Sequence, residues 1–455
     1  MPKKNQIIEG VVSHSIFPNK GVIFVEDMPI YVTGAFEGQY IKARIFKRKK
    51  GTFEAQLLEV VSNPDYFVEP ACLHFGTCGG CTSQQLDYQN QIDLKYNQVK
   101  SLFEKANLSG YEDLGIIGSP NYYEYRNKME FSFGDAVKDG PMTLGMHRKH
   151  STYDVITVDG CKLVDTDFSL ILGTVLDYCK ANNLDYYKKM QHIGFMRYLV
   201  VRRSVTSGEL MINIVTSSQK DFEFNELANI LAALPLNGSV SGVIHTITDN
   251  MADAIKPEKV TTIYGKDTIT EEILGLKFNI SPFSFFQTNT KGAEVLYKNA
   301  LALVDDIDNK TVFDLYCGTG TITQIVATKA KKVYGIELIP EAIVKAKENA
   351  KLNNLDNCHF IAGDVMVEID KLTDSPDIIV LDPPRDGIHP KALQKIIGFG
   401  AKQLLYISCK PTSLTRDLPI LEEAGYKLDK FLAVDMFPQT AHVETIVLLS
   451  HKDAK

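Results

Sequence analysis

The sequence predicts a multidomain α/β protein whose carboxyl-terminal part is built around a parallel sheet. Three observations carry this prediction. From Lys277 onward, apolar strand-like segments alternate with helical segments, which is typical of a parallel sheet covered by helices on both faces. Short β-branched segments separated by turn residues between Ile7 and Val61 are typical of a small antiparallel barrel. At 455 residues, the chain is also too long for one ordinary core.

These changes of pattern divide the chain into three predicted domains. Residues 1–62 form the barrel, 63–275 form a mixed central domain, and 276–455 form the parallel-sheet domain. Within the central domain we expect a helix at about 84–107 that packs on the parallel-sheet domain. We also expect strands at YLVVRRSV and LMINIVTS, because both segments are rich in β-branched residues.

Composition narrows the class of protein but not its function. With 44% hydrophobic and 23% charged residues, the chain has the composition of a soluble globular protein. It has no run of about 18 apolar residues and no apolar segment near its start, so we expect a cytoplasmic protein without a membrane partner. The formal charge of -7 argues weakly against binding to nucleic acid, because phosphate groups require a positively charged surface.

The charge is unevenly distributed along the chain. Residues 1–62 hold nine Lys or Arg and six Asp or Glu, a net charge of +3, and much of the basic charge lies between Lys42 and Lys50. RNA binding by this segment and an ordinary solvated charge run explain the pattern equally well.

The clearest local motif is a glycine-rich turn between a predicted strand and a predicted helix, DLYCGTG. Asp314 and Tyr316 precede Gly318 and Gly320, whose missing side chains let the backbone turn tightly and approach a bound group. The amino end of the following helix favours negative charge there. The motif lacks the third glycine of the dinucleotide fingerprint, so it disfavours a nicotinamide enzyme.

Acidic residues end the next three predicted strands. Glu337 lies 23 residues after Asp314, at the point where an open α/β sheet binds the ribose hydroxyls of a nucleoside. Asp364 ends the third strand, where a side chain can reach an adenine, and Asp382 ends the fourth. Together these acids resemble the S-adenosylmethionine-binding motifs of class I (Rossmann-like) methyltransferases. In the loop DPPR, Arg385 replaces the aromatic residue of amino-group methyltransferases, which disfavours an amine substrate.

A cysteine follows the fifth predicted strand directly. Cys409 is therefore predicted to lie at the carboxyl edge of the sheet, where ligands bind. A single cysteine at such a position is more often an unreactive residue of the hydrophobic core. One reaction that needs an attacking cysteine is the methylation of carbon 5 of a uracil. That carbon is not nucleophilic enough to take a methyl group until a thiolate has added to carbon 6. A base must then remove the carbon 5 proton, and the segment QTAHVET offers Glu444, with His442 beside it.

The order of the motifs FFQTN, DLYCGTG, DPPR, SCKP and HVET resembles that of the RNA uracil-5 methyltransferase family. The resemblance covers nearly the whole chain and implies that Cys409 is the nucleophile, Glu444 the base, and Asp382 the residue that holds the uracil. Lys410 stands where asparagine is usual.

The same resemblance implies roles for FFQTN and for basic residues of the central domain. Gln287 would contact the methyl donor, and Phe285 would stack on a base flipped out of the RNA. In most proteins, however, two adjacent phenylalanines pack in the hydrophobic core. Candidate RNA contacts, which fit an ordinary solvated surface equally well, are Tyr125, Arg126, Lys128, Arg202 and Arg203.

Four cysteines form a candidate metal site. Their soft thiolates suit zinc or an iron–sulfur cluster alike, and four unligated thiols are the third possibility. The ribosomal-RNA branch of the family carries a 4Fe–4S cluster at matching positions, and the barrel resembles its amino-terminal TRAM module. The resemblance therefore implies a 4Fe–4S cluster held by Cys72, Cys78, Cys81 and Cys161.

These features favour a monomeric enzyme acting on 23S ribosomal RNA, with a transfer-RNA uridine methyltransferase as the alternative. Two less favoured hypotheses remain. The first is a methyltransferase that acts on an exocyclic amine of a base, which would need neither Cys409 nor Glu444. The second is a noncatalytic RNA-binding factor.

Overall fold

The computed structural model describes residues 2–49, 52–252 and 254–451, which pack as two units built from discontinuous segments. These units cut across the three domains expected from the sequence, whose boundaries stay predictions. The first unit comprises Met1–Pro70, Cys81–Ser119 and Leu381–Lys455, and the second comprises Ala71–Gly80 and Pro120–Val380.

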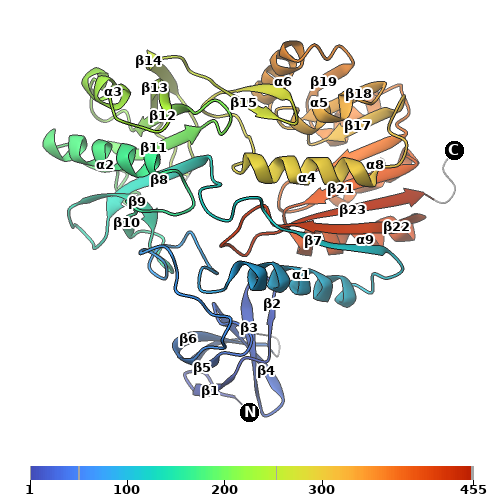
Figure 1. Cartoon of the computed structure of the whole chain (residues 1–455), viewed down its shortest axis with the longest axis horizontal. Coiled ribbons are helices and arrows are strands. Elements are labelled where there is room, and N and C mark those ends of the chain that lie inside the picture. The colour runs from blue at the N-terminus through green and yellow to red at the C-terminus, as the bar shows by residue number, and fades with distance from the viewer. Residues whose placement is uncertain (1, 50–51, 253, 452–455) are drawn as a thin grey trace. The chain divides into compact units, whose positions relative to one another are not determined.

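The amino-terminal part of the first unit is a six-stranded sheet with the strand order β1-β5-β6-β4-β3-β2, drawn in dark blue in Figure 1. Alternate residues such as Ile23, Val32 and Ile41 point into a common apolar core and are at most 1% exposed. The strands are β1 Ile7–Val11, β2 His14–Ile16, β3 Lys20–Val25, β4 Met28–Thr33, β5 Tyr40–Lys49 and β6 Thr52–Ser62.

Two lysines of the basic run on β5 form ion pairs. Lys42 lies 3.7 Å from Glu9 and 3.5 Å from Glu59, and Lys47 lies 3.1 Å from Glu54. Lys50, the last residue of the run, lies outside the described residues.

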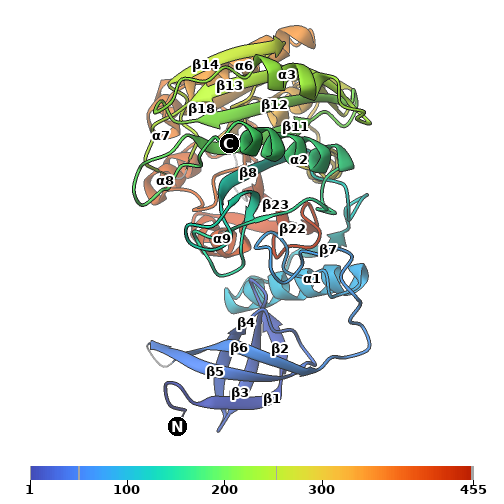
Figure 2. The same cartoon turned by 90° about the vertical axis from the view of Figure 1, so that its left-hand side faces the viewer.

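A long helix, α1 (Tyr88–Lys105), lies within the predicted 84–107 segment and beside the amino-terminal sheet (Figures 1 and 2). It begins at Asp87, whose side chain accepts a hydrogen bond from the backbone N–H of Asn90 at 2.8 Å. The strand that follows, β7 (Glu112–Ile117), pairs in parallel with the carboxyl-terminal strand β22 (Tyr426–Val434).

The carboxyl-terminal strands of the first unit have the order β21-β23-β22-β7. The strand β23 is antiparallel to both of its neighbours, with Ser408 opposite Thr445 and Val434 opposite Glu444. This register places the end of β21 beside the start of β23. The remaining elements of this region are β21 Gln403–Ser408, β23 Glu444–His451, α8 Pro390–Gly398 and α9 Pro411–Glu423.

The second unit contains a seven-stranded sheet with the order β10-β9-β8-β11-β12-β13-β14, and Figure 2 shows β8 and β11 to β14 following one another across it. The predicted strands YLVVRRSV and LMINIVTS correspond to β11 and β12. Two helices, α2 (Thr166–Ala181) and α3 (Asn225–Ala232), pack on one face through buried side chains such as Phe168 and Leu227. The strands are β8 Lys128–Asp135, β9 Met142–His147, β10 Val155–Thr157, β11 Met196–Arg203, β12 Glu209–Thr216, β13 Ser239–Ile247 and β14 Lys259–Gly265.

The rest of the second unit is the alternating strand and helix pattern expected from the sequence. Strands β17 and β18 pair in parallel, as do β18 and β19, and β20 follows β17 in the strand order. Among the described residues, no helix is long and apolar enough to cross a membrane. The elements are β15 Ile269–Ile273, β16 Leu276–Ile280, α4 Thr290–Leu303, β17 Thr311–Leu315, α5 Thr321–Ala327, β18 Lys332–Glu337, α6 Pro340–Leu352, β19 Cys358–Ala362, α7 Val365–Glu368, a 3-10 turn Ile369–Lys371 and β20 Ile378–Leu381.

Candidate active site

In the second unit, the glycine-rich turn connects β17 to α5. Asp314 is fully buried, and one of its carboxyl oxygens accepts a hydrogen bond from the Thr323 hydroxyl of α5. The other oxygen, Oδ1, has no hydrogen-bond partner among the described residues. Burial is the main cause that raises the pKa of Asp314 to about 7. A buried carboxyl with an unused acceptor at this turn can serve a polar ligand.

The turn itself needs backbone conformations that favour glycine. Gly320 has φ of 75°, and a Cβ atom there would lie 2.7 Å from the ring of Phe360. Gly318 has φ of 55°, and a Cβ there would meet nothing within 4 Å. Tyr316 adopts a φ of 73°, and its N–H donates to the carbonyl of Ile336 at 3.0 Å. The turn is therefore tight at Gly320 and open at Gly318.

Glu337, at the end of β18, lies beside the same turn. Its Oε2 accepts a hydrogen bond from the Gly318 N–H at 3.1 Å, and its Oε1 accepts one from the Ile339 N–H at 3.0 Å. These bonds hold the carboxylate at the strand end while each oxygen keeps a second lone pair for a hydroxyl. Asp364 is exposed and caps α7, accepting from the Met366 N–H at 2.9 Å.

The two adjacent phenylalanines of FFQTN have opposite environments. Phe286 is 4% exposed and packs against Phe278, whereas Phe285 is 68% exposed. The carbonyl of Phe285 accepts a hydrogen bond from the Thr319 hydroxyl at 3.1 Å, which ties this segment to the glycine-rich turn. Gln287 is half-buried, and its carbonyl accepts from the Asn127 side chain at 3.0 Å.

In the first unit, Cys409 lies between the end of β21 and the start of α9. The neighbouring Ser408 is held on both sides: its carbonyl accepts from the Thr445 hydroxyl at 2.9 Å, and its hydroxyl accepts from the Lys410 N–H at 3.3 Å. Lys410 is the N-cap residue of α9. Cys409 itself is half-buried.

Glu444 is the first residue of β23 and is 3% exposed. Burial and then the nearby charge of Asp382 raise the pKa of Glu444 to about 8, while Arg385 opposes the rise. Burial, followed by the charges of Glu444 and Asp382, raises the pKa of Cys409 to about 11, and Arg385 again opposes the rise. The structure therefore brings the three predicted catalytic residues into one electrostatically coupled group.

Arg385 is the cation of this group, and the sequence did not reveal that role. Its Nη2 lies 3.5 Å from Nε2 of His442. Its carbonyl accepts a hydrogen bond from the Ser413 hydroxyl of α9 at 2.7 Å. In the same loop the Ile388 N–H donates to the buried Asp417 of α9 at 3.1 Å. Two side chains of α9 thus hold the chain at Arg385 and at Ile388, next to the exposed guanidinium.

Three of the four predicted metal-ligating cysteines influence one another in the second unit. Burial raises the pKa of the Cys78 and Cys161 thiols, and the charge of Cys72 raises both further. The Gly80 N–H donates to Sγ of Cys78 at 3.3 Å. Cys81 belongs to the first unit. Within the described ranges, no group of three or more His, Cys, Asp or Glu side chains is arranged to hold a metal ion, so the cluster stays a prediction.

The basic residues proposed as RNA contacts differ in exposure. Arg202 is 2% exposed and donates to the carbonyl of Ser284 at 2.9 Å, and burial lowers its pKa to about 10. Tyr125 is also buried. Arg203 lies 3.4 Å from Asp165 in an ion pair. Neither Tyr125 nor Arg202 is therefore an ordinary solvated surface residue. Arg126 and Lys128 are half-buried.

Comparison with known proteins gives consistent matches. The family model described as tRNA (uracil-5-)-methyltransferase matches residues 87–371, and a general methyltransferase-domain model matches residues 306–437. An uncharacterized RNA methyltransferase of Clostridium acetobutylicum is 49% identical over 99% of both chains. One of Staphylococcus aureus is 34% identical over 99% of both chains.

A solved structure resembles the whole chain. The tRNA (uracil-54, C5)-methyltransferase of Pyrococcus abyssi, in complex with S-adenosyl-L-homocysteine, superposes with a TM-score of 0.78 at 24% identity. The match covers 97% of this chain and 100% of the other. At this level of identity the likeness concerns the fold.

Proposed function

Because the chain belongs to the RNA uracil-5 methyltransferase family, we propose that it methylates carbon 5 of a uridine in 23S ribosomal RNA through a covalent adduct with Cys409. Its fold is that of the class I methyltransferases, and it is an S-adenosylmethionine-dependent RNA methyltransferase. The observation that carries the covalent mechanism is the coupling of Cys409, Glu444 and Asp382, since a thiol, a buried base and an orienting acid are what the reaction requires.

The proposed reaction proceeds in two stages at these side chains. The Cys409 thiolate adds to carbon 6 of the uracil, and the electrons of the ring double bond move toward the carbon 4 carbonyl to form an enolate. Carbon 5 of the enolate then bonds to the methyl group that S-adenosylmethionine would supply when bound, and the sulfonium sulfur leaves with the electrons of the methyl–sulfur bond. Glu444 then takes the carbon 5 proton, the electrons of that bond restore the ring double bond, and the sulfur–carbon 6 bond breaks.

The environment of Glu444 makes this carboxylate a stronger base than an ordinary glutamate, and the ionised fraction that can act as the base increases as pH rises toward 8. A carboxyl with a pKa of about 8 holds an abstracted proton far better than an ordinary glutamate. Arg385 favours the ionised forms of both Glu444 and Cys409, which supports formation of the nucleophile. We assign Asp382 to holding the uracil ring and Phe285 to stacking on the flipped base, because Phe285 is the exposed member of its aromatic pair.

The residues of the glycine-rich turn fit S-adenosylmethionine. Glu337 offers two fixed carboxylate oxygens for ribose hydroxyls, and Asp314 offers the unused acceptor Oδ1. The open space at Gly318 lets a ligand approach the backbone. We assign the remaining donor contacts to Gln287, Tyr316, Gly320, Asp364 and Asp382.

We propose a 4Fe–4S cluster at Cys72, Cys78, Cys81 and Cys161 because four thiolates are the donor set that such a cluster uses. Cys78 and Cys161 are largely buried and receive backbone hydrogen bonds, from Gly80 to Cys78 and from Leu163 and Val164 to Cys161. Such donors stabilise the sulfurs of a cluster, whose role here would be structural. Protein purified without oxygen should absorb near roughly 400 nm and lose that band in a Cys161→Ala variant. A colourless protein containing zinc would contradict the assignment.

The choice of ribosomal RNA rests on the amino-terminal sheet and the four cysteines. Phe24 and Phe46 of that sheet are exposed, and Arg44 lies on the same strand as Phe46, a combination that suits stacking and phosphate contact. We therefore propose that residues 1–62 act as a TRAM-like RNA-binding module. Transfer RNA is the alternative, since the matching family model carries that substrate in its description.

Mass-spectrometric mapping of 5-methyluridine in RNA from a strain lacking the protein tests the assignment. We expect a 23S ribosomal RNA site to lose its methyl group and to regain it when the gene is restored. Loss of the methyl group at a transfer-RNA site instead would show that the substrate is transfer RNA. If every uridine keeps its methyl group, the proposed function fails.

A further inference from the structure

Helix α1 carries a stripe of buried polar side chains on one face. Gln91, Lys95 and Gln98 follow one another at helical spacing, and each is at most 2% exposed. The buried face of a helix is normally apolar, and lysine is almost never buried without a partner. These three side chains therefore have a role other than packing.

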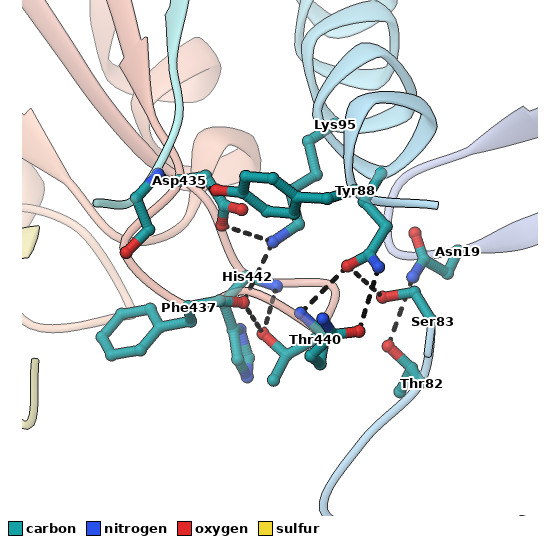
Figure 3. Close-up of polar contacts among 12 residues, drawn as sticks. Asn19, Thr82, Ser83, Tyr88, Lys95, Asp435, Phe437, Thr440 and His442 are labelled. Atoms are coloured by element: carbon teal, nitrogen blue, oxygen red, sulfur yellow. Dashed lines mark hydrogen bonds and ion pairs between the residues drawn. The ribbon is translucent and has the colours of Figure 1, made fainter. Parts of the chain in front are cut away.

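Lys95 lies at the centre of this stripe and forms a buried ion pair. Its Nζ lies 2.6 Å from Oδ1 of Asp435, a residue with no exposed surface, and also donates to the carbonyl of Phe437 at 3.0 Å. Figure 3 shows both contacts. Removing two charges from water costs about as much as their attraction returns, so such a pair is better suited to fixing geometry than to adding stability.

One helical turn earlier, Gln91 holds the same segment at a second point. Its Nε2 donates to Oε1 of Gln439 at 2.9 Å, and its Oε1 accepts from the Gln439 N–H at 3.0 Å. Gln439 has φ of 67°, a left-handed conformation that non-glycine residues seldom adopt unless their surroundings impose it. The N–H of Thr82 donates to the Gln439 carbonyl at 2.8 Å, and Thr82 in turn accepts from Asn19 at 3.3 Å.

The segment held in this way leads directly into the proposed base. The Phe437 carbonyl that Lys95 contacts also accepts from the Thr440 hydroxyl at 2.7 Å, and that hydroxyl accepts from the N–H of His442 at 3.2 Å. Val443 is fully buried, and Glu444 follows as the first residue of β23. A displacement of residues 435–443 would therefore move the start of β23 relative to the end of β21.

We propose that Lys95 and Gln91 are positioning residues that hold residues 435–443, which we call the base loop, so that the Glu444 carboxyl stays within reach of the carbon 5 proton. This inference rests on the proposed function, since it assigns a task to Glu444. The Lys95 contact with the Phe437 carbonyl and the Gln91 contact with Gln439 are the two anchors. Addition of Cys409 to carbon 6 does not use these anchors, whereas proton removal depends on them.

The test compares the step that needs Glu444 with the step that does not. A Glu444→Gln variant cannot remove the proton, so the methylated adduct between Cys409 and RNA should accumulate and survive denaturing gel electrophoresis. In the double variant Lys95→Met/Asp435→Leu, two apolar side chains replace the ion pair, which removes the anchor without leaving an unpaired buried charge. Lys100→Met is the matched control on α1, because Lys100 pairs with Asp113 at the partly exposed surface.

We expect the double variant to fold, to lose about ten- to a hundredfold in kcat with an unchanged KM for RNA, and to accumulate the denaturant-resistant adduct. Lys100→Met should turn over like the unaltered protein. Turnover by the double variant at the unaltered rate would overturn the inference, as would slower turnover without adduct. If neither the unaltered protein nor Glu444→Gln reacts with RNA at all, the proposed function itself fails. That result differs from both outcomes that would overturn only the inference about Lys95 and Gln91.

Discussion

Replacing Glu444 by glutamine should stabilise the protein while abolishing its turnover. Glu444 is 3% exposed and lies near Asp382, so its ionised form is disfavoured in the folded chain. Glutamine has nearly the same shape and does not ionise. The substitution therefore removes a cost that the folded protein bears at neutral pH, and it also removes the proposed base.

The size of this effect follows from the pKa of Glu444, about 8 in the folded state against an ordinary value of 4.5. Below pH 4.5 the carboxyl is protonated in both states and costs nothing. As pH rises toward 8, the unfolded chain ionises while the folded chain keeps its proton, so stability falls by about 1.4 kcal/mol for each pH unit. At pH 7 the cost is about 3 kcal/mol, and it stops growing above pH 8.

Urea unfolding of both proteins between pH 4 and 9 measures this cost. Groups with raised pKa values on which Glu444 does not act, such as Asp314, cancel in the difference. We expect the free energies of unfolding to agree near pH 4.5 and to separate by about 3 kcal/mol at pH 7, with Glu444→Gln the more stable. A difference that does not change with pH, or a less stable variant at pH 7, would show that Glu444 is not held in the environment described above.

Four further substitutions test other parts of the site. Arg385→Leu should move the pH dependence of kcat/KM to higher pH, because Arg385 lowers the pKa of the nucleophile and of the base; an unmoved profile would contradict that role. Phe286→Ala should lower the free energy of unfolding by about 3–5 kcal/mol. Phe285→Ala should leave the melting temperature unchanged and slow RNA methylation. Equal melting curves for the two variants would refute the assignment of Phe286 to the core and Phe285 to the RNA. Gly320→Ala should weaken S-adenosylmethionine binding in calorimetry, since its Cβ would press on Phe360 in a left-handed backbone; unchanged affinity would argue against it.

Local patterns in the sequence were sufficient to predict the residues at strand ends. Asp314 and Glu337 lie at or next to the last residue of an apolar strand, and Cys409 directly follows one. They could therefore be placed at the ends of β17, β18 and β21 without knowledge of the tertiary contacts. The family resemblance then connected Cys409 with Glu444. In the structure the charge of Glu444 helps to raise the pKa of Cys409, and the catalytic roles of the two residues stay a prediction.

The sequence could not reveal contacts that join distant segments. Lys95 and Asp435 are 340 positions apart, and a lysine in a helix is normally expected at the surface. The strand β7 lies in the segment assigned to the central domain, yet it pairs with β22 of the carboxyl-terminal region. Arg202, expected at the surface from its charge, is buried by tertiary packing. In each case the deciding interaction lies outside any local window of sequence.

The central claim is that Cys409 attacks carbon 6 and that a proton must leave carbon 5. RNA containing 5-fluorouridine tests it directly, because the proposed base cannot remove fluorine from carbon 5 after methylation. With S-adenosylmethionine present, we predict a denaturant-resistant complex in which mass spectrometry finds a methylated fluorouridine on the peptide that contains Cys409. Normal turnover of this RNA without an adduct, or an adduct at another residue, would contradict the account.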